Sequence, residues 1–114
     1  MSVTIYHNPK CSKSRQTLEL LREHSITPVI IEYLKSPPSA KKLKEILAQL
    51  GYSPRDLMRK KEAEYSECRH PSLSDDELID FMIKNPILIE RPIVLANGKA
   101  ALGRPPEQVL EILH

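Results

Sequence analysis

The stretch VTIYHNPKCSKSRQTLELLREH, residues 3–24, changes from a β-rich run to a helical pattern across one short loop. Residues 3–7 form the β-rich run, and residues 14–24 place two leucines on one face of a helix. A second run, VIIEYL at residues 29–34, is apolar and begins with β-branched side chains. Two strands joined by a helix of this length lie parallel with a right-handed crossover, so this part of the chain predicts a βαβ unit.

The centre of the chain has the apolar spacing of helices. Ser36 and Pro37 are expected as the N-cap and first residue of a helix that stops at Gly51. Apolar side chains recur between these signals at the spacing i, i+3, i+4 and i+7, namely at Leu43, Ile46, Leu47 and Leu50. The sequence SPRD, residues 53–56, opens another short helix.

A further helix is predicted over residues 73–86. Ser74 and Glu77 have the spacing of a capping box, and Pro86 ends the helical pattern. The preceding tract, residues 60–72, is charged and contains a proline, so we expect it to fray into a loop.

The last quarter of the chain predicts a hairpin and a helix. PIVLANGKAALG, residues 92–103, returns to a period of two, and Asn97-Gly98 is typical of a type I′ turn. PPEQVLEILH, residues 105–114, then predicts a helix with prolines in its first turn. Its inward-facing residues are expected to be Val109, Leu110 and Leu113.

The order βαβ, helical insertion, ββα indicates the fold class. A parallel pair of strands, an antiparallel pair and flanking helices are typical of an α/β, thioredoxin-like domain with a mixed four-stranded sheet. We expect one domain over residues 1–114, enlarged by a helical insertion at about residues 37–90.

Composition excludes several functional classes. Seventeen Lys and Arg against fifteen Asp and Glu give a formal charge of +2 with the signs interspersed, so we expect no binding of nucleic acid. No apolar run approaches the ~18 residues of a membrane span, and Lys10 lies where a signal peptide is apolar. We therefore expect a cytoplasmic protein, not bound to a membrane, whose two cysteines are reduced. The four histidines and two cysteines show no paired metal-ligand spacing, so no metal is expected.

Cys11 lies in the loop between the first strand and the first helix. Unpaired N–H groups and the helix dipole at such a position favour a thiolate. Neighbouring side chains add cationic or hydroxyl groups, namely His7, Lys10, Ser12, Lys13, Ser14 and Arg15. Cys68, by contrast, lies in a tract of irregular pattern and has no such surroundings. Cys11 is therefore the candidate nucleophile, and Cys68 is interpreted as incidental.

Three arginines lie at or near element boundaries and are candidates for binding an anion: Arg59, Arg91 and Arg104. Arg91 and Arg104 each precede a proline, which pushes the backbone toward an extended conformation. Guanidinium groups arranged around a thiolate would form a fork-shaped receptor for a tetrahedral oxyanion.

Four motifs together resemble a known family. HNPKCSKSR (7–15), LMR (57–59), NPILIERPIV (85–94) and NGKAALGRPPE (97–107) resemble, in order, the glutaredoxin-coupled arsenate reductases of the ArsC family. The resemblance implies that Cys11 is the nucleophile and that the three arginines bind the arsenate and arsenite groups. It also implies that His7 and Ser14 lower the thiol pKa, and that Pro92 is the cis-proline of this fold.

The implied reaction is attack of the Cys11 thiolate on arsenate, followed by resolution of the adduct by a second thiol. Ser14 occupies the position where a C-x-x-C motif would have its second cysteine, so the resolving thiol has to come from outside. The resemblance implies glutathione as co-substrate and glutaredoxin as partner. We expect no bound cofactor and a monomeric chain.

Three alternatives stay open. A low-molecular-weight phosphatase, or a phosphatase-like arsenate reductase, would have an arginine six residues after Cys11, where this chain has Thr17. A redox-responsive transcription regulator that binds RNA polymerase would use a C-x-x-C disulfide, which Ser14 removes. A glutathione-linked thiol oxidoreductase with another substrate would keep the fold and the Cys11 thiol.

Overall fold

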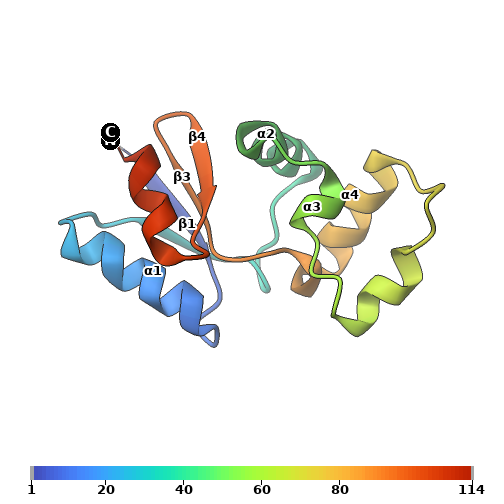
Figure 1. Cartoon of the computed structure of the whole chain (residues 1–114), viewed down its shortest axis with the longest axis horizontal. Coiled ribbons are helices and arrows are strands. Elements are labelled where there is room, and N and C mark those ends of the chain that lie inside the picture. The colour runs from blue at the N-terminus through green and yellow to red at the C-terminus, as the bar shows by residue number, and fades with distance from the viewer. Residues whose placement is uncertain (1, 114) are drawn as a thin grey trace. The chain divides into compact units, whose positions relative to one another are not determined.

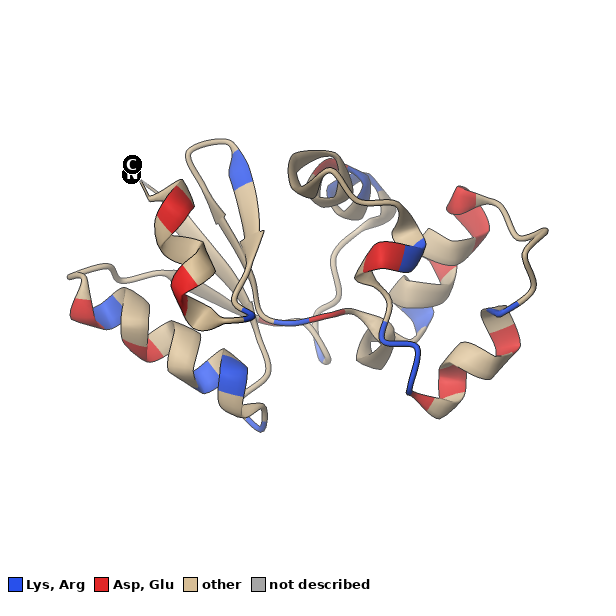
Figure 2. Ribbon diagram, in the orientation of Figure 1, with Lys and Arg blue, Asp and Glu red and all other residues tan. Residues whose placement is uncertain are grey.

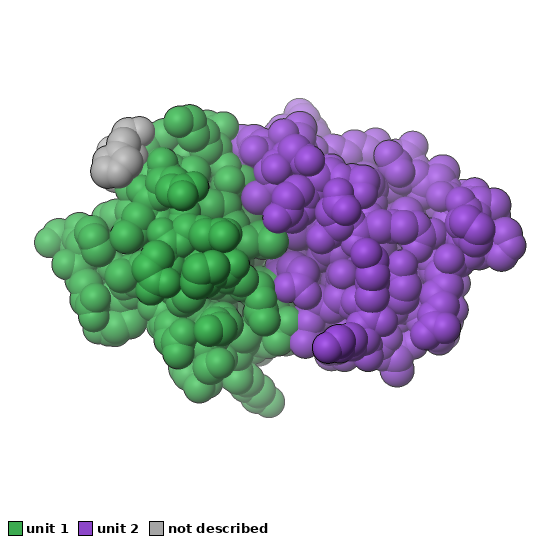
Figure 3. Space-filling view, in the orientation of Figure 1, with its two compact units in different colours: residues 1–36, 91–114 green, residues 37–90 purple. Residues whose placement is uncertain are grey.

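The computed structural model describes residues 2–113, so Met1 and His114 lie outside the described residues. Two compact units are present (Figure 3), one combining the chain up to Ser36 with the chain from Arg91 onward, the other covering Pro37–Glu90. The second unit has the bounds of the predicted helical insertion. The grouping of both units into one domain over residues 1–114 stays a prediction.

The first unit is an α/β structure with the predicted mixed four-stranded sheet (Figure 1). Its elements are β1 (Val3–His7), α1 (Ser12–Glu23), β2 (Val29–Glu32), β3 (Ile93–Ala96), β4 (Lys99–Leu102) and the 3₁₀ helix η3 (Pro106–Ile112). The strand order is β2-β1-β3-β4, with β1 parallel to β2 and the other two pairs antiparallel. The chain therefore enters α1 from the end of a central strand.

The core of this unit lies between one face of the sheet and the pair formed by α1 and η3. It contains Val3, Ile5, Leu18, Leu21, Val94, Ala96, Val109 and Ile112. Burying an aliphatic side chain of this size stabilises a fold by about 1.5–3 kcal/mol, so the cluster holds α1 firmly against β1. Of the three residues predicted to face inward in η3, Leu110 and Leu113 are only half-buried, whereas Ile112, which was not predicted, is buried.

The hairpin has the predicted turn. Asn97 and Gly98 both have positive φ angles, 55° and 71°, as a type I′ turn between twisted strands requires. The Asn97 Nδ2 group also donates to the carbonyl of Ile112 at 2.9 Å, which ties the turn to the last helix. That helix is 3₁₀ from Pro106 to Ile112, shorter and tighter than the one predicted over residues 105–114.

The second unit is helical, as predicted. It comprises α2 (Ala40–Leu50), α3 (Pro54–Leu57), the 3₁₀ helix η1 (Ala63–Cys68), α4 (Asp75–Lys84) and the 3₁₀ helix η2 (Pro86–Leu88). Capping boxes are present at Ser53 and Ser74, and α4 carries the acidic first turn that complements its dipole (Figure 2). The capping-box prediction for Ser74 and Glu77 is confirmed.

The predicted start of α2 is wrong by three residues. Ser39 is the N-cap and accepts a hydrogen bond from the Lys42 N–H at 3.1 Å, whereas Ser36 donates its N–H to the Glu32 carbonyl at 2.9 Å. That turn also ends β2 at Glu32, two residues before the predicted end. Pro37 precedes another proline, which disfavours the helical region and delays the helix.

The tract 60–72 contains a 3₁₀ helix rather than only a loop. Arg55, on α3, donates to the Tyr65 hydroxyl at 2.8 Å and to the carbonyls of Cys68 and His70 at 3.1 and 2.8 Å. These bonds come from a residue outside the tract, so the pattern of the tract itself does not indicate them. Charge-assisted hydrogen bonds of this kind order a segment whose own sequence favours fraying.

Candidate active site

The strand-to-helix connection places Cys11 at the N-cap of α1. Its backbone is extended, with φ −94° and ψ 125°, and its N–H donates to the Asn8 carbonyl at 3.0 Å to close a turn. Its carbonyl accepts the first bond of the helix from the Arg15 N–H, also at 3.0 Å. Cys11 is 9% exposed, so most of its surface is removed from water.

Opposing effects determine the protonation of Cys11. Burial raises the pKa of the thiol, but the backbone N–H groups of Ser14 and Lys13 and the guanidinium of Arg91 lower it, and the net shift is downward. The side chain makes no capping hydrogen bond of standard geometry. The N–H groups of the first helical turn nevertheless favour its charged form. The site therefore holds a thiolate more readily than an ordinary cysteine does.

The side chains of His7 and Ser14 lie together beside the loop that carries Cys11, and their predicted part in lowering the thiol pKa stays a prediction. The Ser14 hydroxyl lies 3.0 Å from His7 Nδ1 and accepts from the Asn8 N–H, also at 3.0 Å. Burial lowers the pKa of His7, against the opposing charge of Glu32. The Ser14 hydroxyl thus joins the end of β1 to α1. The backbone N–H of Ser14 lowers the pKa of the Cys11 thiol.

Arg91 and Arg104 lie together in the first unit. An Arg104 Nη1 group donates to the Arg91 carbonyl at 3.2 Å. Among residues 2–113, Arg91 Nε is a buried side-chain nitrogen without a hydrogen-bond partner. A buried donor left unsatisfied costs about 1–3 kcal/mol.

Close packing holds the arginine segments against α1. The peptide bonds Arg91–Pro92 and Arg104–Pro105 are both cis, the first as the family resemblance implied. Gly103 donates its N–H to the Pro92 carbonyl at 3.0 Å. A Cβ at Gly103 would overlap Thr17 Oγ1 and lie 2.8 Å from Pro92 Cγ, so no larger residue fits between these segments.

Arg59 belongs to the second unit. Its guanidinium pairs with Glu62 at 2.9 Å and more loosely with Glu90 at 3.9 Å, and its backbone N–H donates to the Leu88 carbonyl at 2.7 Å. The structure therefore brings Cys11, Arg91 and Arg104 into the first unit. Arg59 belongs to the second unit, where it pairs with the carboxylates of Glu62 and Glu90.

Comparisons with known proteins identify the family of this chain. The model of the ArsC family matches residues 6–112, which include the Cys11 loop and all three arginines. The chain belongs to the ArsC family. Its ArsC-family relatives include the uncharacterized protein YfgD of Escherichia coli strain K12, which is 55% identical over 97% of this chain and 96% of its own.

Named arsenate reductases are also among the relatives of this ArsC-family chain. That of Rhizobium meliloti is 47% identical, over 99% of this chain and 82% of its own. The solved structure of an arsenate reductase from Vibrio cholerae superimposes with a TM-score of 0.95 at 56% identity, covering 99% of this chain and 98% of its own. The thioredoxin-like fold class is thereby confirmed.

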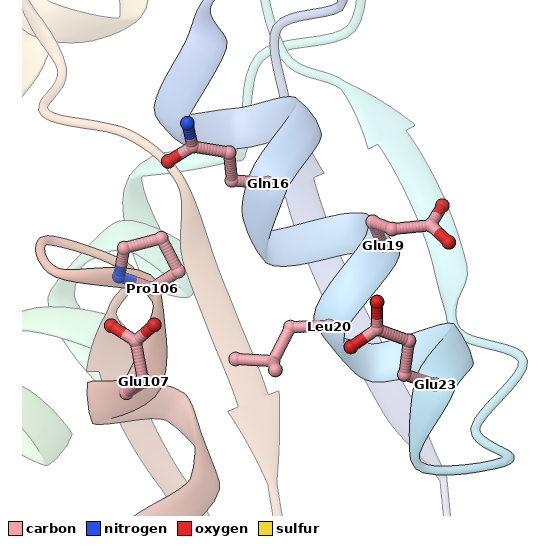
Figure 4. Close-up of a pocket in the computed structure, with 6 residues that line it drawn as sticks. All are labelled: Gln16, Glu19, Leu20, Glu23, Pro106 and Glu107. Atoms are coloured by element: carbon pink, nitrogen blue, oxygen red, sulfur yellow. The ribbon is translucent and has the colours of Figure 1, made fainter.

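Other features of this ArsC-family chain do not resemble an oxyanion site. A cavity of about 280 Å³ between α1 and η3 (Figure 4) is lined by Gln16, Glu19, Leu20, Glu23, Pro106 and Glu107. Its three carboxylates would repel an anion.

Within residues 2–113 no group of three or more metal-binding side chains occurs, and no helix there is long and apolar enough to cross a membrane.

Sequence patterns do not indicate that Thr17 and Gly103 help to position the residues of the ArsC-family site. Thr17 is buried in α1 and donates its hydroxyl to the Lys13 carbonyl at 2.8 Å, which places its side chain against Gly103. The only available signal was the Gly103-Arg104-Pro105 sequence, where a glycine directly precedes a restricted arginine.

Cys11 is expected to alkylate faster than Cys68 at neutral pH. Burial raises the pKa of Cys68, whose Sγ donates to the Tyr65 carbonyl at 3.4 Å, whereas the pKa of Cys11 is lowered. Iodoacetamide labelling of the Cys68→Ser protein between pH 5 and 9 measures Cys11 alone, with a midpoint expected below the ordinary ~8.5. Arg91→Ala should move that midpoint upward. Equal labelling rates for the two cysteines would contradict this assignment.

Proposed function

We propose that the chain reduces arsenate to arsenite with Cys11 as the nucleophile. One observation carries the proposal: a cysteine favoured as thiolate lies beside Arg91, whose buried Nε has no partner within the described residues. A nucleophile and an unsatisfied cationic donor in one place suit attack on a tetrahedral oxyanion. The names of the arsenate reductase relatives support the choice of arsenate as that oxyanion.

In the proposed first step the Cys11 sulfur attacks arsenic. A sulfur–arsenic bond forms, and one arsenic–oxygen bond breaks as that oxygen takes up protons and leaves as water. Arg91 and Arg104 would bind the remaining oxygens by charge-assisted hydrogen bonds as the adduct forms. We include Arg59, whose guanidinium pairs with Glu62, among the arsenate-binding residues.

Reduction from As(V) to As(III) takes two electrons, and we propose that an external thiol completes the pair. Attack of a glutathione thiolate on the Cys11 sulfur would release arsenite and leave a Cys11–glutathione disulfide. Glutaredoxin would then reduce this disulfide. Cys68 is poorly suited to the task because it is fully buried and burial raises its pKa. We further propose that the chain acts as a cytoplasmic monomer without a bound cofactor.

Supplying the two thiol systems separately tests the proposal. Arsenate-dependent NADPH consumption is expected with glutathione, glutaredoxin and glutathione reductase. Little is expected with thioredoxin and its reductase, because thioredoxin requires an intramolecular disulfide that this chain has no second suitable cysteine to form. The same assay with Cys68→Ser is the control and should give parent rates.

Two results would redirect the proposal. Thioredoxin-driven turnover that disappears in Cys68→Ser would make Cys68 the resolving residue. Reduction of glutathione mixed disulfides without any response to arsenate would instead favour the glutathione-linked oxidoreductase with another substrate.

A further inference from the structure

The turn before Cys11 has a central peptide bond, between Pro9 and Lys10, that can take two orientations. The Cys11 N–H donates to the Asn8 carbonyl at 3.0 Å, so residues 8–11 form a four-residue turn. The orientation of the central peptide distinguishes a type I from a type II turn, and rotating it changes the backbone angles of the residues on both sides. Because Cys11 directly follows the second of these residues, its placement depends on how this peptide is held.

Two side chains hold the Pro9–Lys10 peptide, one at each end. Asn8 Oδ1 accepts a hydrogen bond from the Lys10 N–H at 3.0 Å, and Arg15 Nη1 donates to the Pro9 carbonyl, also at 3.0 Å. Both bonds are exposed to water, which competes for the same groups, so each alone contributes modestly. Acting on one planar group, the two bonds together oppose its rotation.

These two side chains belong to the two elements that flank the turn. Asn8 directly follows β1, and its N–H donates to the Ser14 hydroxyl of α1 at 3.0 Å. Arg15 lies in α1, and its N–H donates to the Cys11 carbonyl at 3.0 Å. The peptide is thus tied both to the end of the strand and to the start of the helix, through bonds that do not involve the Cys11 sulfur.

We propose that Asn8 and Arg15 are positioning residues, which jointly fix the Pro9–Lys10 peptide and so keep Cys11 at the N-cap of α1. The N–H groups of the first helical turn favour the thiolate only while Cys11 holds that position. The consequence for arsenate turnover rests on the proposed function, whereas the hold on Cys11 does not.

Amide hydrogen exchange of Lys10, followed by NMR, tests the shared peptide. Arg15→Met removes the bond at the carbonyl end and leaves the Asn8 side chain in place. The Lys10 N–H should nevertheless exchange about threefold faster, because the peptide that carries it is freed to rotate. Arg15→Lys keeps a charged donor and should restore part of the protection.

The matched control for this measurement is Arg22→Met. Arg22 is an exposed arginine in the last turn of the same helix, so the variant makes the same chemical change away from the turn. Its Lys10 exchange rate should equal that of the parent. An unchanged Lys10 rate in Arg15→Met would overturn the inference.

The pH profile of Cys11 alkylation, measured with Cys68→Ser as the background, tests the effect on the thiol. Asn8→Ala and Arg15→Met should each raise the midpoint. The double variant should raise it by more than the sum, because one bond still holds the peptide in each single variant. Asn8→Ala changes no charge, which separates the loss of a hydrogen bond from the loss of a cation. Arg91, whose charge lowers the pKa of the thiol, is retained in all of these variants.

Turnover gives the last measurement. In the double variant Asn8→Ala with Arg15→Met, kcat for arsenate should fall about fivefold while KM stays within about twofold, because the arginines proposed to bind arsenate lie on other segments. The parent midpoint of Cys11 alkylation in that double variant would overturn the inference, even in a protein that reduces arsenate. A raised midpoint in a protein without arsenate turnover would uphold the positioning role and remove the proposed function.

Discussion

Replacing Cys11 by serine is expected to reduce arsenate turnover by more than about 10³-fold, to the uncatalysed background. The N–H groups of Ser14 and Lys13 and the charge of Arg91 lower the pKa of a thiol that burial alone would raise. The pKa of an alcohol is far higher than that of a thiol, so the same groups do not ionise a serine hydroxyl near neutral pH. The folded structure should be retained, because serine fits the N-cap and satisfies the first turn of α1.

The measurement is arsenate reduction with saturating thiol, accompanied by thermal unfolding. Cys68→Ser is the matched control, since it makes the same atomic change at a cysteine in the second unit. Its turnover should equal that of the parent, with a stability loss of about 1 kcal/mol from placing a more polar group at a buried site. Residual activity above a tenth of the parent rate in Cys11→Ser would show that Cys11 is not the nucleophile.

Replacing Gly103 by alanine is expected to lower both stability and arsenate turnover. The added methyl group would overlap Thr17 Oγ1 and press on Pro92 Cγ, so the segment carrying Arg104 has to move away from α1. Overpacking of this kind costs about 1–3 kcal/mol. Arg104 is bonded to the Arg91 carbonyl at 3.2 Å, so the displacement should reach both arginines of the candidate oxyanion site.

Thermal unfolding together with the KM for arsenate checks this effect. The double variant Thr17→Ala with Gly103→Ala removes the atoms of Thr17 that the methyl group meets, and it should recover part of the lost stability. Cys11 should still be alkylated in Gly103→Ala, which separates displaced arginines from a lost nucleophile. Parent values for both Tm and KM would show that the segment accommodates the methyl group without moving.

Local signals along the chain were sufficient to predict most of the elements of this structure. The Asn97-Gly98 pair predicts its turn because the required positive φ angles belong to these two residue types, whatever surrounds them. The same holds for Ser74 and Glu77, whose reciprocal hydrogen bonds span only three residues. The position of Cys11 at a helix start likewise follows from the change of period around it.

Local signals failed where neighbours in space, or a second local preference, decided the outcome. The tract 60–72 is ordered by Arg55, whose guanidinium reaches it from α3 through bonds that no pattern within the tract indicates. The start of α2 moved to Ser39 because the Ser36 N–H closes the turn after β2 and Pro37 precedes another proline.

The sequence by itself determined the βαβ and ββα order, the hairpin and the cysteine at the start of α1, because each depends on interactions within a few residues. Only the tertiary structure decided that Arg91 acts on the Cys11 thiol and that Gly103 must lack a side chain. The physical reason is range: charge and packing act through space, and residues 80 or more positions apart in this chain meet only after the sheet has formed.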